Sequence, residues 1–85
     1  MTAEESQVIA LLHVASTRLL NAATATNELR ASILQHDLER ARLANDEIAE
    51  HMTVIEAVFQ QVIQIANAHK AAVMALAVQM REMIQ

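Results

Sequence analysis

The residues best suited to acid–base or metal chemistry are the histidines and carboxylates, which are most concentrated around His51. Glu47 and Glu50 lie within one helical turn of that imidazole. His36 and Glu39 could approach the same place from a second helical arm. The Glu-x-x-His spacing of di-metal sites in helix bundles is absent, because Glu50 directly adjoins His51. We interpret the group as polar residues around a turn and expect no metal site and no cofactor.

Two further kinds of reactive side chain also lack a chemical setting. His69 lies within a run of apolar positions beside Lys70, which favours a core or interface imidazole over a metal ligand. If buried, it would make assembly sensitive to mild acid. The serines, Ser6, Ser16 and Ser32, have no strained turn, oxyanion-binding loop or base nearby. We therefore expect no enzymatic activity and no catalytic residues.

Composition points to helix throughout. The chain of 85 residues has no glycine, proline, tryptophan or tyrosine, and 54% of its residues are hydrophobic. Without the usual turn formers, hairpins and sheets are disfavoured, whereas Ala, Leu, Gln, Glu, Met and Arg propagate helix. Cysteine is absent as well, which excludes disulfides and thiolate metal sites. We predict an all-α fold in a single helical domain over residues 1–85.

Apolar residues recur at alternating spacings of three and four, which is the period of helices packed lengthwise. Thr2 followed by Glu5 has the spacing of a capping box, so the first helix is expected to begin near residue 3. Its apolar series is Val8, Leu12, Ala15, Leu19, Ala22, Thr26, Leu29 and Ile33. A second series is out of phase with the first: Leu34, Leu38, Ala41, Asn45, Ile48, Met52, Ile55, Phe59, Val62, Ala66, His69, Val73, Leu76, Met80 and Met83.

The place of the turn between the helices decides the architecture. Asn45 tolerates a left-handed conformation and Asp46 is a good N-cap, so we predict a turn near Asn45-Asp46. Helices over about 3–43 and 47–84 would then form a long antiparallel hairpin that packs into an oligomeric bundle. The alternative is one continuous helix in a coiled coil, with Asn45 as a buried polar residue that fixes register.

The apolar arc of the second arm is wider than one neighbouring helix can cover. Val58 and Ile65 flank the second series on one side, and Ile63 flanks it on the other. Such a pattern is typical of a helix with neighbours on two or three sides. We therefore expect a homo-oligomer or a helical protein partner. The predicted interface residues are Leu34, Leu38, Ile48, Met52, Ile55, Phe59, Val62, Ile65, Val73, Leu76, Met80 and Met83.

Charge and hydropathy argue against nucleic acid and membrane as partners. The formal net charge is −4 and the basic residues are scattered, which is a poor footprint for phosphate binding. The first residues are acidic where a secretory signal is basic, and the longest apolar run, residues 71–78, is too short to span a bilayer. We expect a soluble chain without a cleavable signal or transmembrane segment, with the cytoplasm as the favoured location.

Three functions are compatible with this pattern. The first is a non-enzymatic structural or adaptor module that self-associates through its wide apolar helix faces. The second is a small helical chaperone or regulator that masks the amphipathic helix of a partner. The third is a membrane-active helical protein, which is less favoured because the polar face lacks the Lys and Arg enrichment that attracts anionic lipid.

Overall fold

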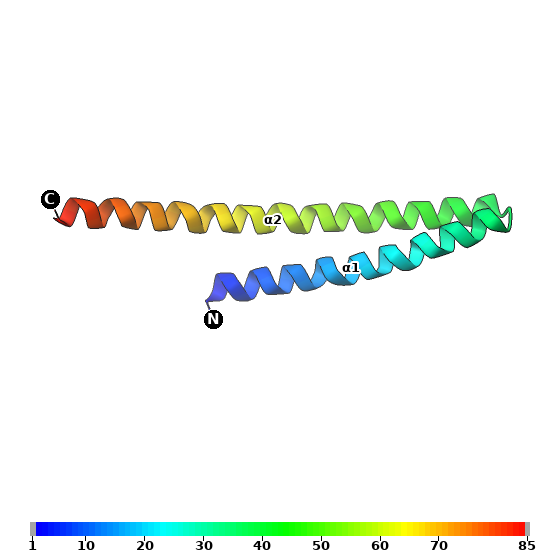
Figure 1. Ribbon diagram of the computed structural model, residues 1–85, viewed down its shortest axis with the longest axis horizontal. Coiled ribbons are helices and arrows are strands. Elements are labelled where there is room, and N and C mark those ends of the chain that lie inside the picture. The colour runs from blue at the N-terminus through cyan, green and yellow to red at the C-terminus, as the bar shows by residue number, and fades with distance from the viewer. Residues whose placement is uncertain (1, 85) are drawn as a thin grey trace.

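Two long helices joined by a short turn form an antiparallel hairpin (Figure 1). The computed structural model describes residues 2–84, with side chains to residue 83. Helix α1 spans Ala3–Leu34 and helix α2 spans Leu38–Ile84. Residues 2–84 contain no strand, so the predicted all-α hairpin is confirmed and the continuous-helix alternative is wrong.

The hairpin is a rod rather than a globule. It measures 73 × 19 × 13 Å, and its radius of gyration is 20.7 Å. A globular domain of this length has a radius of gyration of roughly 12 Å. Helix α2 has 47 residues and α1 has 32. The C-terminal part of α2 therefore extends beyond the beginning of α1, as Figure 1 shows.

The predicted position of the turn is wrong. The chain reverses at residues 35–37, whereas Asn45 and Asp46 lie within α2. The helices are consequently 3–34 and 38–84, and not 3–43 and 47–84. Asp46 stabilises the helix that it was expected to interrupt, because its carboxylate pairs with Arg42 at 3.4 Å one turn earlier.

The turn is a Schellman motif made without glycine. His36 takes the left-handed conformation with φ of 58°, which histidine adopts more readily than most residues. The amide of Asp37 donates to the Ser32 carbonyl at 2.9 Å, and that of His36 donates to the Ile33 carbonyl at 3.1 Å. Asp37 also caps α2, since its Oδ1 accepts from the Arg40 amide at 3.1 Å. One residue thus ends α1 and begins α2.

Helix α1 starts at a true cap and continues without a break. The Thr2 hydroxyl accepts a hydrogen bond from the Glu5 amide at 3.1 Å, as the capping-box spacing predicts. Residues 21–27 combine poor helix formers, yet they remain helical. The hydroxyls of Thr24 and Thr26 donate to carbonyls one turn back, so these polar side chains are satisfied within the helix.

Small side chains line the contact between the helices, which we call the seam. Its positions recur every three and four residues, the spacing of a two-helix coiled coil. Most of its fully buried apolar residues are alanines, and Ser32 is completely inaccessible. Small side chains allow two helix axes to approach closely. The seam consists of Val8, Leu11, Ala15, Arg18, Ala22, Ala25, Leu29 and Ser32 in α1 and Ala41, Ala44, Ile48, His51, Ile55, Val58, Val62 and Ile65 in α2.

The position of the turn can be tested with glycine. His36→Gly relieves the left-handed strain and should stabilise the hairpin by about 0.5–1 kcal/mol. Asn45→Gly places glycine inside a helix and should destabilise it by roughly 0.3 kcal/mol. Urea unfolding followed by circular dichroism measures both changes. Stabilisation by Asn45→Gly together with a loss in His36→Gly would place the turn at Asn45.

Candidate interaction surfaces

One long side of the hairpin carries large, exposed apolar side chains, and we call this side the apolar flank. Most of its residues directly follow a seam residue, as Leu19 follows Arg18 and Met52 follows His51. In antiparallel helices such positions lie on the same side of the seam in both partners. Between 42% and 77% of each residue is exposed. The flank consists of Leu12, Leu19 and Ile33 in α1 and Leu38, Met52, Phe59, Val73 and Met80 in α2.

The opposite side of the seam is polar near the turn. Arg40 of α2 donates from Nε to the Glu28 carboxylate of α1, and its Nη1 donates to Gln35 at 2.8 Å. The hydrogen bond between Arg40 and Glu28 holds the pKa of the Glu28 carboxyl below its usual range and raises the pKa of Arg40. Arg42 pairs with Glu39 at 2.6 Å, and its pKa is raised by that hydrogen bond. The two sides of the hairpin therefore differ in chemistry.

A polar cluster interrupts the seam near the middle of its length. His51 is only 8% exposed, and its Nδ1 lies 3.1 Å from Arg18 Nη1 across the seam. A guanidinium can only donate, so Nδ1 is the acceptor and the proton of the neutral imidazole is on Nε2. Nε2 in turn lies 3.4 Å from Glu47 Oε1. This arrangement satisfies the buried imidazole and joins the two helices at one register.

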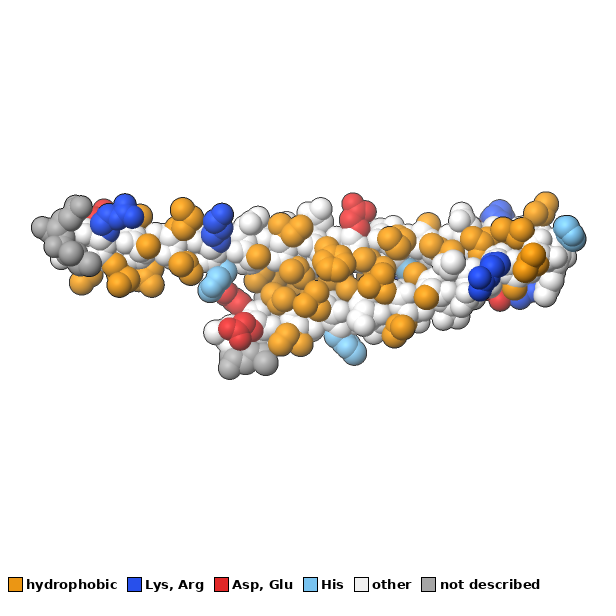
Figure 2. Space-filling model, in the orientation of Figure 1, with side chains coloured by type: hydrophobic (Ala, Val, Ile, Leu, Met, Phe, Trp, Pro, Cys, Tyr) orange, Lys and Arg blue, Asp and Glu red, His pale blue; other side chains and the backbone are white. Residues whose placement is uncertain are grey.

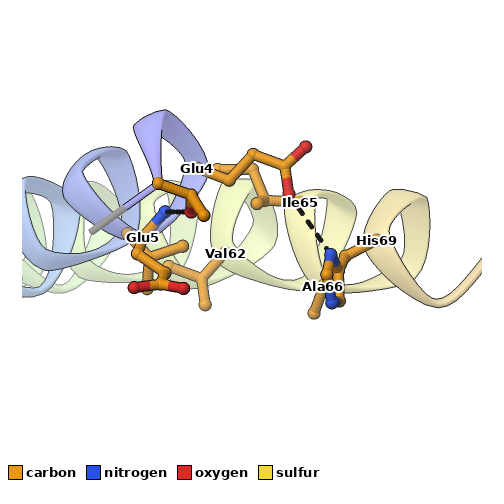
Figure 3. A pocket seen from close by; sticks show the side chains of 8 residues that line it. Glu4, Glu5, Val62, Ile65, Ala66 and His69 are labelled. Carbon is orange, nitrogen blue, oxygen red and sulfur yellow. Dashed lines mark hydrogen bonds and ion pairs between the residues drawn. The ribbon is translucent and has the colours of Figure 1, made fainter. Parts of the chain in front are cut away.

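Where α1 begins, the two helices leave an open apolar groove with an acidic rim (Figure 3). It has a volume of about 220 Å³. Glu4 Oε2 lies 3.4 Å from Nδ1 of His69, and both side chains are mostly exposed. His69 is therefore outside the core of the hairpin. The groove is lined by Thr2, Glu4, Glu5, Val8, Val62, Ile65, Ala66 and His69.

Beyond this groove, residues 70–84 of α2 have no neighbouring helix, and we call them the overhang. Figure 1 shows this end of α2 continuing past the N-terminus of α1. Its large apolar residues are at least half exposed. They are Val73, Met74, Leu76, Val78, Met80 and Met83.

The predicted interface residues divide into two groups in the structure. Ile48, Ile55, Val62 and Ile65 lie in the seam, where α1 already covers them partly or fully. The other predicted residues are exposed: Leu34, Leu38, Met52, Phe59, Val73, Leu76, Met80 and Met83. Sequence reasoning did not identify Leu11, Arg18, Ala25, Ser32, Ala44 and His51 as seam positions. The signal available for them was the regular spacing of small residues, with alanine or serine in three of those six positions.

Neither a metal site nor a transmembrane segment was expected from the sequence. Within residues 2–84, no three His, Asp or Glu side chains are grouped so that they could hold a metal ion. By length and composition alone, one stretch of α1 is apolar enough to cross a membrane. A single such helix near the N-terminus is weak evidence, because core helices of soluble proteins and signal sequences have the same property. Only 17% of that stretch is buried in the hairpin, so most of it faces outward.

Comparisons of the chain with protein-family models, curated proteins and solved structures found no match. The surfaces described above are therefore the basis for any functional argument.

The Glu28–Arg40 pair predicts an acid-dependent contribution to stability. The folded-state pKa of Glu28 is depressed, so its contribution is present above the ordinary glutamate pKa and is lost as pH falls through the lowered value. Glu28→Gln should lower the melting temperature at neutral pH, and its difference from the parent should vanish in strong acid. Melting curves across pH measure this. Glu56→Gln, at an exposed residue, is the control; an equal effect in it would contradict the role of the pair.

The buried Arg18–His51 contact predicts strong coupling between two substitutions. Arg18→Leu leaves the buried imidazole without its donor and should cost about 1–3 kcal/mol of unfolding free energy. The double variant Arg18→Leu, His51→Leu removes both polar partners and should regain most of that loss. A double-mutant cycle by urea unfolding measures the coupling. Strictly additive losses would show that the contact does not hold the helices together.

Proposed function

We propose that this protein is a non-enzymatic structural or adaptor module that self-associates through its apolar helix faces. The observation that carries the proposal is that small apolar side chains are buried between the helices while many large ones are exposed to solvent. Alanines fill most of the buried seam, while Leu19, Met52 and Phe59 are at least 42% exposed on the apolar flank. Monomeric proteins rarely leave a contiguous patch of large apolar side chains in water, and such patches mark interaction sites.

The exposed area supports the same proposal. The hairpin exposes 6647 Å². A compact monomer of its mass, 9.4 kDa, exposes roughly 5,000 Å². The excess of roughly 1,600 Å² is about twice the area, roughly 800 Å², that one partner contributes to a standard protein–protein interface. Full burial of a Leu, Met or Phe side chain contributes about 1.5–3 kcal/mol, so covering a few of them rivals the total stability of a small domain.

The distribution over the surface favours packing on one side. Figure 2 shows hydrophobic side chains gathered along the line where the two helices meet. The apolar flank runs from Leu38 near the turn to Met80 in the overhang, whereas Glu28, Arg40 and Glu47 occupy the other side. Two hairpins that meet through this flank would form a four-helix bundle, which buries the large apolar side chains and leaves the charged side chains exposed to solvent.

A second candidate function is the masking of a partner's amphipathic helix. The flank that would bind another hairpin exposes large apolar side chains, among them Met52 and Phe59, that a single foreign amphipathic helix could cover. A third is membrane association, which the apolar stretch of α1 favours. These functions differ from the first in what the purified chain does alone.

Oligomeric mass tests the proposal. We expect the purified chain to be helical at micromolar concentration. Light scattering coupled to size exclusion should give a mass at least twice the 9.4 kDa of one chain. The double variant Leu19→Gln, Phe59→Gln removes two apolar side chains from the flank and should weaken association at least tenfold. A tenfold change corresponds to about 1.4 kcal/mol, less than the burial of one such side chain.

The matched control is Leu20→Gln, Ile63→Gln, which replaces two apolar residues outside the flank that are more exposed than Leu19 and Phe59. It should retain the parent's mass. A stable, helical monomer at high concentration would overturn self-association. Helix gain or dye leakage with vesicles of anionic phospholipid, in place of a defined oligomer, would indicate the membrane function.

A further inference from the structure

The seam spacing continues along α2 beyond the point where the N-terminus of α1 lies. This spacing of three and four residues, followed from Val58 through Ile65, reaches Ala72, Leu76, Gln79 and Met83 in the overhang. Apart from Gln79 these residues are apolar, and all of them are exposed because α1 starts at Ala3. The face that α2 presents to α1 over residues 41–65 thus persists without a neighbour.

We propose that this part of the seam is covered by the overhang of a second copy of this chain, running antiparallel to the first. The inference rests on the self-association proposed above and adds to the contact through the apolar flank a second contact between copies, at the overhang. A two-fold axis across the overhang places residues 70–84 of each copy in the space beside the other. Both α1 helices then continue in line with an overhang, and the rod has two helices along its whole length.

The spacing of the seam, together with overlap of the two overhangs over their full length, sets the register of this pairing. In an antiparallel coiled coil the a positions of one helix face the d positions of the other across the contact. In the overhang, Leu76 and Met83 are a positions, and Ala72 and Gln79 are d positions. Ala72 then lies opposite Met83 of the second copy, and Leu76 lies opposite its Gln79. The first contact thus places a small side chain opposite a large one; the intramolecular seam also contains both small and large side chains. Each Gln79 lies near the centre, where two amides can bond to each other.

Two features of the hairpin are consistent with this occupant. The positive pole and acidic first turn of α1, with Glu4 and Glu5, would face the negative pole of the second copy's α2, whose last turn carries Arg81. Val73 and Met80 of the overhang belong to the apolar flank. Antiparallel pairing keeps these positions of both copies on one side, so the flanks of the two hairpins join into one face.

Disulfide trapping tests the arrangement, since the chain has no cysteine of its own. Two full-length single variants, Ala72→Cys and Met83→Cys, are mixed and oxidised. The antiparallel register brings these positions within disulfide range, a Cα separation below about 7 Å, and should give a mixed disulfide dimer. Each variant alone should stay uncrosslinked, because identical positions lie about 16 Å apart along the rod.

Association of the unoxidised chain separates the possible failures. Crosslinking of each variant with itself would show parallel overhangs and overturn the arrangement. A defined oligomer with no mixed disulfide would overturn it while leaving the proposed self-association standing. A monomer would overturn both. Leu76→Glu should reduce association at least tenfold, whereas Met74→Glu, at an equally exposed residue away from the seam, should leave it unchanged; equal effects would argue against the seam as the contact.

Discussion

Packing of two helices along a seam whose fully buried residues are mainly alanine and serine is the constraint on which the rest of the structure depends. Such a seam buries little apolar area per residue, so the hairpin gains less from its own core than its composition would permit. The large apolar residues are displaced to positions beside the seam, as at Leu19 and Phe59. The surface pattern is therefore a direct consequence of how the seam is built.

A seam of small residues also specifies register weakly, because alanine fits opposite many neighbours. The polar contacts supply the missing specificity. A slip of one turn would separate Arg18 from His51 and leave a buried imidazole without a donor, at a cost of about 1–3 kcal/mol. Near the turn, the ion pair of Glu28 with Arg40 favours the same alignment, although it is exposed to solvent. A buried polar group that fixes register is an established device of coiled coils.

Composition and periodicity were sufficient to predict two long antiparallel helices, but not the turn or the face that the helices share. The turn was missed because His36 and Asp37 perform the roles that Asn45 and Asp46 were expected to perform, and local propensity does not distinguish the pairs. The shared face was predicted only in part, because alternate members of each predicted series, such as Val8 and Ala15, lie in the seam while the members between them lie beside it. Leu12 and Leu19 were assigned to the apolar series of the first helix, whereas Leu11 and Arg18 occupy the seam. Which half of a wide apolar arc is covered within the chain depends on how closely two backbones can approach, and hydrophobicity alone does not report this.

The wide arc on α2 then has a simple physical explanation. One half of it, which includes Ile55 and Val58, packs against α1, and the other half, which includes Met52 and Phe59, remains open. A helix that needed only its own hairpin partner would carry polar residues on the second half, as most amphipathic helices do. The apolar residues there cost solubility, and they do not stabilise the isolated hairpin. Their presence over the whole length of α2, from Leu38 to Met80, is best explained by neighbours that lie parallel to the rod, and this favours lengthwise packing of hairpins over a contact at a single point.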